Sequence, residues 1–94
     1  MASGVMMIPI PKRGIYRGTS GIDEARVVPG IVDIRLTAKL DQLLIPLPEG
    51  ASYLGFIFAR ASRAADVDVA LRTAHARLTF TIAPEMRVLQ STHG

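Results

Sequence analysis

A short cationic loop holds the side chains of this 94-residue chain that are best suited to bind an anion. Two prolines stiffen the loop before Lys12 and Arg13, and the strand predicted at Ile15–Arg17 adds a third cation, Arg17. Guanidinium and ammonium groups of this kind can bind a substrate carboxylate or a neighbouring domain. We therefore take Arg17, Lys12 and Arg13 as candidate substrate-binding residues, and a solvated turn is the simpler alternative.

Catalytic groups are scarce in the rest of the sequence. The chain has no cysteine, which excludes a disulfide framework, a thiolate zinc site and a cysteine nucleophile. The two histidines, His75 and His93, stand apart in a predicted helix and in the C-terminal tail, with no nucleophile paired to either of them. We assign no catalytic residue.

No pattern in the sequence predicts a metal site or a phosphate-binding loop. Asp66 and Asp68 fall in the first turns of a predicted helix, where the helix dipole already favours carboxylates. The glycines at Gly14, Gly18 and Gly21 lack the spacing of dinucleotide-binding and P-loop motifs. They are typical of turns around a short strand.

Length and composition predict one small domain, and the absence of cysteine favours a cytoplasmic location. A chain of 94 residues can bury one modest core, and with 49% hydrophobic but only 5% aromatic residues that core must be aliphatic. The net charge of +3 is scattered instead of forming a basic stripe, so we expect no nucleic-acid partner. No stretch approaches the roughly 20 apolar residues of a membrane span, so we expect no membrane partner either.

The first half of the chain predicts a short helix after the strand at Ile15–Arg17. Ser20 precedes Asp23 by three residues, the spacing of a capping box. This predicts a helix at Ile22–Val28, which Pro29 and Gly30 would end.

The middle of the chain predicts three strands. Ile31–Thr37 alternates apolar and polar residues, as a strand with one wet face does. The side chains expected on its buried face are Val32, Ile34 and Leu36. Leu43–Ile45 predicts a short extra strand, and Tyr53–Arg60 is almost wholly apolar, which favours a central strand covered on both faces.

The second half predicts a long helix and a last strand. Ser62 offers an N-cap for a helix at Ala64–Arg77. Its expected buried stripe is Val67, Ala70, Leu71, Ala74 and Leu78. Leu78–Ile82 alternates as a strand, and Val5–Ile8 predicts one more strand at a sheet edge.

The order of these elements predicts a ferredoxin-like βαββαβ sandwich of the α+β class. We expect a mostly antiparallel sheet with two helices on one face and an extra edge strand. Residues 1–84 would form this single domain, and residues 85–94 a tail.

An ordered series of short motifs runs from about Met6 to Ile82. Its motifs are Met7-Ile8-Pro9-Ile10-Pro11, Gly14-Ile15-Tyr16-Arg17-Gly18, Gly21-Ile22-Asp23-Glu24-Ala25-Arg26, Val28-Pro29-Gly30 and Pro48-Glu49-Gly50-Ala51-Ser52-Tyr53-Leu54-Gly55. Taken together, these motifs resemble the C-terminal domain of ATP-grasp ligases of the L-amino-acid ligase type, relatives of biotin carboxylase and carbamoyl-phosphate synthetase.

The resemblance implies a parent enzyme that activates a carboxylate with ATP and magnesium and joins it to an amine. The ATP-binding and metal-binding residues of that family lie in a central grasp domain, so the resemblance implies no cofactor in this chain. It implies a domain that packs against the ATP-grasp domain of the parent chain, with a positioning role for Arg17 and with Lys12 and Arg13 nearby.

A self-standing binding or oligomerisation module with the same sandwich is the alternative. We also expect a homodimer or a concentration-dependent mixture, because a domain removed from its parent leaves bare the apolar surface that met the grasp domain.

Overall fold

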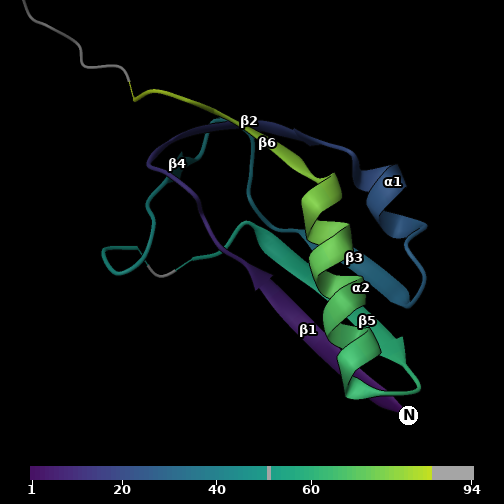
Figure 1. Ribbon diagram of the computed structural model, residues 1–94. Helices are drawn as coiled ribbons and strands as arrows, with labels where there is room; N and C mark the ends of the chain where they lie inside the picture. The colour runs from purple at the N-terminus through teal and green to yellow at the C-terminus, as the bar shows by residue number, and fades with distance from the viewer. Residues whose placement is uncertain (51, 86–94) are drawn as a thin grey trace, which may run out of the picture.

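The computed structural model describes residues 1–50 and 52–85, which form six strands and two helices. In chain order these are β1 (Ala2–Ile8), β2 (Gly14–Ser20), α1 (Ile22–Arg26), β3 (Ile31–Leu36), β4 (Leu43–Leu44), β5 (Gly55–Ala61), α2 (Ala64–Arg77) and β6 (Thr79–Ala83). The predicted α+β class is confirmed, and the arrangement is compatible with a small ferredoxin-like domain (Figure 1). Of the predicted tail, residues 86–94 with His93 lie outside the described residues.

The strands are divided into two antiparallel sheets, where one sheet was expected. Their orders are β1-β5-β3 and β4-β2-β6. The two βαβ units begin with β2 and β5, and these two strands are not paired with each other. Instead, β1 pairs with the whole length of β5, from Ala2 opposite Ala61 to Ile8 opposite Gly55. Pro9 lacks an N–H group and directly follows β1, so the chain leaves one sheet there and enters the other as β2.

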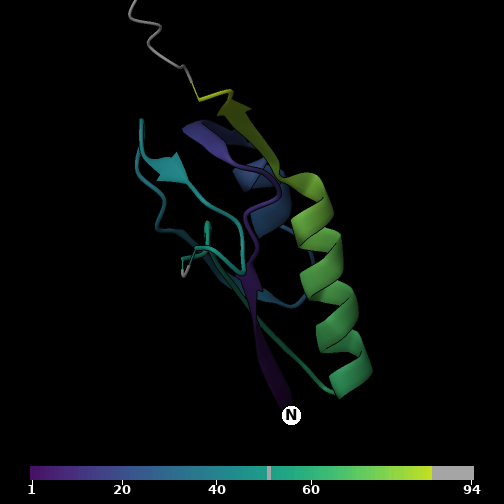
Figure 2. The same cartoon turned by 90° about the vertical axis from the view of Figure 1, so that its left-hand side faces the viewer.

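Helix α2 follows the predicted bounds and the predicted buried stripe. Its buried side chains are Val67, Ala70, Leu71 and Ala74. The helix packs on the β1-β5-β3 sheet, and Figure 2 shows it from the side. Gly4 lets the helix lie directly on β1, because a Cβ atom there would stand 2.9 Å from Cγ1 of Val67. The predicted N-cap is wrong by one residue: Arg63 occupies the N-cap, and no side chain caps the helix.

Helix α1 is shorter than predicted and starts differently. It covers five residues, and Gly21 at its N-cap adopts the left-handed conformation with φ 84°. The predicted capping box between Ser20 and Asp23 does not form, since no side chain caps this helix either. A Cβ on Gly21 would stand 1.9 Å from the carbonyl oxygen of Arg77, so the close approach of α2 determines this helix start.

Strand β3 contains a bulge that overturns one predicted core position. The register with β5 shifts between Ile31 and Asp33, so one extra residue faces Ala59. Val32 is therefore exposed, whereas Ile31 packs against the core with Ile34 and Leu36. The predicted burial of Val32 is wrong because the bulge interrupts the alternation.

One core joins both sheets and the helices. Its fully buried side chains are Ile8, Ile34, Leu44, Leu54 and Ile57. The backbone N–H of Leu54 donates to the carbonyl oxygen of Ile8 at 2.9 Å, which fixes the long connection after β4 against the end of β1. No described helix has both the length and the apolar character needed to cross a membrane.

Candidate functional site

The predicted cationic loop lies between β1 and β2, and its second cation is already paired. Ile10 is buried and anchors the loop, while Lys12 and Arg13 are exposed. The Nε of Arg13 donates to Oε1 of Glu85 at 2.8 Å, and this bond raises the pKa of Arg13. Within the described part of the chain, Lys12 forms no ion pair.

Arg17 is exposed on β2 and donates to the carboxylate of Asp41. The turn that contains Asp41 is held against β2 by two backbone hydrogen bonds to Tyr16. The N–H of Asp41 donates to the Tyr16 carbonyl and the N–H of Tyr16 donates to the Gln42 carbonyl, both at 2.9 Å. Asp41 takes a positive φ of 69°, which aspartate tolerates better than most residues. The turn therefore fixes an acid beside the predicted substrate-binding arginine.

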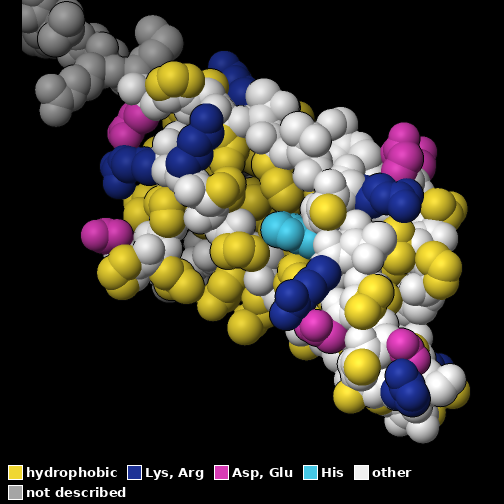
Figure 3. Space-filling model, in the orientation of Figure 1, with side chains coloured by type: hydrophobic (Ala, Val, Ile, Leu, Met, Phe, Trp, Pro, Cys, Tyr) yellow, Lys and Arg dark blue, Asp and Glu magenta, His cyan; other side chains and the backbone are white. Residues whose placement is uncertain are grey.

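The structure thus places all three predicted residues on the exposed surface around β2, with acids against Arg13 and Arg17. Figure 3 shows cationic side chains next to acidic and hydrophobic ones at the end of the molecule that holds β4 and the end of β6. Such an arrangement can exchange an internal carboxylate for one from a ligand, since exposed ion pairs are weak.

The two acids that were considered as metal ligands, and the histidine that was considered as a base, have other contacts in the structure. Asp66 and Asp68 contact Arg63 at 3.6 Å and Arg72 at 3.1 Å, along their own helix. No cluster of three or more metal-ligating side chains exists within residues 1–50 and 52–85. His75 is half-buried beside Phe80, with 6.5 Å between the ring centroids.

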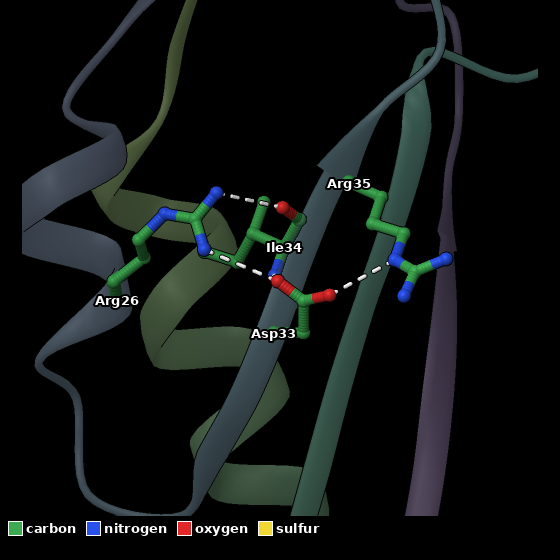
Figure 4. A network of polar contacts seen from close by, with 4 residues as sticks. All are labelled: Arg26, Asp33, Ile34 and Arg35. Carbon is green, nitrogen blue, oxygen red and sulfur yellow. Dashed lines mark hydrogen bonds and ion pairs between the residues drawn. The ribbon is translucent and has the colours of Figure 1, made fainter.

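A polar network that sequence reasoning did not identify ties α1 to β3 (Figure 4). The Asp33 carboxylate accepts from Arg26 at 3.1 Å, from Arg35 at 2.9 Å and from the backbone N–H of Ile34 at 2.8 Å. Arg26 also donates to the Ile34 carbonyl at 2.9 Å. The bond from Arg35, then those from Arg26 and the backbone, lower the pKa of Asp33 despite partial desolvation. The sequence signal was present, since both arginines lie close to Asp33 in the chain.

The β1-β5-β3 sheet leaves an apolar face uncovered on the side opposite the helices. Strand β5 is central as predicted, but only one of its faces is buried, because Phe56 and Phe58 remain half-buried on the other. The predicted cover on both faces is therefore wrong. Exposed Val5 and Val32 lie beside Phe58 and help to line a hollow of about 580 Å³.

Charged groups border this uncovered face. The guanidinium of Arg35 lies 6.0 Å from the centre of the Phe58 ring, and Arg60 and Asp33 also line the hollow. An aromatic and aliphatic centre with an arginine-rich rim is the composition of a surface that contacts another protein domain.

The fold and these surfaces define a small α+β domain that presents ion pairs and an apolar sheet face to its surroundings. The chain belongs to the family L-amino acid ligase C-terminal domain 2, whose model matches residues 6–83. The resemblance found in the sequence motifs is thereby confirmed at the level of the ligase C-terminal domain.

A solved structure agrees with this assignment. The L-amino acid ligase from Bacillus licheniformis is similar over 86% of this chain with a TM-score of 0.74. The sequence identity is 17%, so the match establishes a shared fold. The match covers 20% of the Bacillus chain, so the present chain spans about one fifth of that ligase. No curated protein sequence matches the chain.

Proposed function

We propose that this chain acts as the C-terminal accessory domain of an ATP-grasp carboxylate–amine ligase. The family match over residues 6–83 carries this proposal. Because the chain spans only a fifth of the similar ligase, the nucleotide machinery would reside in the remainder of a parent protein, which would use ATP and magnesium. In this role the domain packs against the ATP-binding domain and helps to shape the substrate site.

The uncovered face of the β1-β5-β3 sheet supports the packing role. Val5, Met7 and Val32 are more than half exposed there, next to half-buried Phe56 and Phe58. Burial of apolar surface contributes roughly 25 cal/mol for each Å² removed from water, so a domain that covers this face gains stability.

The cations around β2 support the substrate-site role. A substrate carboxylate can take the place of Asp41 at Arg17 or of Glu85 at Arg13, because each arginine is exposed and offers further donors. Lys12 adds a charge beside them. These residues would position a carboxylate, while the reacting groups belong to the ATP-binding domain.

The test is made on a longer protein that contains this domain. Phosphate release from ATP with magnesium is measured across pairs of L-amino acids, and the expected result is release that depends on both amino acids. Arg17→Ala is expected to raise KM for the carboxylate substrate about tenfold, the scale of one charge-assisted bond. Arg72→Ala is the control, because Arg72 also forms an exposed ion pair with an aspartate but lies on α2. A longer protein without ATP-dependent ligation would favour the self-standing module instead.

A further inference from the structure

The outer edge of β1 is unprotected against pairing with another strand. β1 lies at the end of its sheet, and its seven residues pair with β5 in one unbroken register. The strand Ala2–Ile8 contains no charged residue and no proline, the two common devices that prevent edge-to-edge pairing. At the opposite end of the sheet, β3 carries a bulge together with Asp33 and Arg35. Only β1 therefore presents a flat, uncharged edge in this sheet.

The side of α2 that faces this edge carries a charge pair. Val67 and Leu71 lie over Gly4 of β1, where an added Cβ would stand 2.9 Å and 3.6 Å from their side chains. Asp66, Val69 and Thr73 line a hollow with the loop after α1. Successive residues of an α-helix are rotated by about 100° around its axis. Asp68 and Arg72 therefore lie on the opposite flank of the buried stripe from Asp66, Val69 and Thr73, and this flank is above the β1 edge. Their Nε–Oδ2 distance of 3.1 Å marks an i,i+4 ion pair.

This charge pair is complementary to itself under a two-fold axis. In two antiparallel copies of α2 centred near Ala70, Asp68 of each copy faces Arg72 of the other. The centre lies near the level of Gly4, which precedes Val5 at the middle of β1. A symmetric interface requires this property, since one patch must fit its own copy.

The spacing of the layers agrees with the same axis. α2 packs over β1 and β5, so pairing of two β1 strands would separate the two α2 axes by two strand spacings, about 10 Å. Helices pack at 8–10 Å. The edge pairing and the helix contact can therefore form together.

We propose that two copies of this chain associate through antiparallel β1 strands, with Val5 near the two-fold axis and with the α2 helices side by side. The result is one six-stranded sheet with a two-helix layer above it. The uncovered face of the sheet, which the proposed ligase role uses, remains accessible, so this inference goes beyond that role and does not depend on it.

The mass of the full chain in solution tests the proposal. Light scattering after size exclusion, over a concentration series, is expected to approach twice 10.1 kDa. Val5→Lys brings two like charges together at the axis and is expected to raise the dimer dissociation constant about tenfold or more. Val32→Lys is the matched control: Val5 is 52% and Val32 60% exposed in the same sheet, but Val32 lies on β3. A chain that stays monomeric throughout, or a dimer that both lysine variants weaken equally, would overturn the proposal.

A charge exchange tests the helix contact separately. Asp68→Arg is expected to weaken the dimer, and adding Arg72→Asp is expected to restore it, because the exchanged pair is again complementary to its copy. Asp66→Arg, on the α1 side of the same helix, is the control and should leave the dissociation constant unchanged. Failure of the double variant to recover would contradict the antiparallel helix pair.

A single cysteine locates the axis. The chain has no cysteine of its own, so Val5→Cys introduces the only thiol. Two opposed residues of antiparallel strands lie within disulfide range, and mild oxidation should cross-link this variant into dimers. The Val32→Cys variant should remain uncross-linked, and equal cross-linking of both would overturn the assignment to β1. None of these measurements requires a ligase, so their failure leaves the proposed function untouched.

Discussion

At the residue scale, Gly21 lies where the end of β2, the start of α1 and the last residue of α2 meet. Its φ of 84° and the 1.9 Å approach of a Cβ to the Arg77 carbonyl predict that Gly21→Ala lowers the free energy of unfolding by about 2 kcal/mol or more. Urea unfolding measures the change. Gly18→Ala is the control, because Gly18 also has a positive φ, 133°, but has open space around it. A Gly21→Ala variant with the free energy of unfolding of the parent would show that the contact with Arg77 contributes nothing.

The Asp33 network makes a second prediction at the same scale. Hydrogen bonds from Arg35 and then Arg26 lower the pKa of Asp33, so its carboxyl should titrate below the ordinary value of about 3.9 in a carbon-13 NMR titration. Arg35→Gln should move this midpoint upward more than Arg26→Gln does. A midpoint at or above the ordinary value would contradict the network.

The sign of the pH dependence follows from the direction of this shift. A depressed folded-state pKa means that the unfolded chain binds the proton more readily, so the contribution to stability is present above the unfolded value. That contribution is lost as the pH falls through the folded-state pKa. Asp33→Asn should therefore make the free energy of unfolding fall less steeply at acid pH. Near neutral pH, the slope of the free energy of unfolding against pH should stay unchanged.

At the element scale, α2 is held by one buried stripe. Leu71→Asp should unfold the domain, because an unpaired buried charge costs several kcal/mol against a total stability of about 5–15 kcal/mol. Circular dichroism melts test this expectation. Val69→Asp introduces the same charge two residues away at a side chain that is 61% exposed, and it should melt near the parent temperature. A cooperatively melting Leu71→Asp variant would contradict the packing of α2.

At the scale of the whole molecule, we predict that the chain alone neither binds nor hydrolyses ATP, whereas the proposed parent protein does both. A magnesium triphosphate needs cations, backbone amides and metal-bridging carboxylates that converge on one cleft. Here Arg13 and Arg17 already contact Glu85 and Asp41, and both pairs are exposed. Calorimetric titration with ATP and magnesium should give no heat of binding. Micromolar binding that Arg17→Ala abolishes would make the domain a nucleotide-binding module.

Local patterns were sufficient for most elements. The helix at Ala64–Arg77, the edge strand that became β1 and the alternation of β6 could all be predicted, because each depends on a periodicity read within a few neighbouring residues. The ordered motifs also identified the family. The local cluster of cations after two prolines selected Lys12, Arg13 and Arg17 as the candidate anion-binding residues, and their substrate role stays a prediction.

Contacts between distant segments were decided only by the tertiary structure. Glu85 reaches Arg13 across 72 residues and Asp41 reaches Arg17 across 24, so no local spacing could reveal these pairs. The bulge that exposes Val32 depends on how β3 meets β5, and the uncovered faces of Phe56 and Phe58 depend on which side of the sheet receives both helices. Periodicity reports which side chains share a face of an element, whereas burial of that face depends on what packs against it.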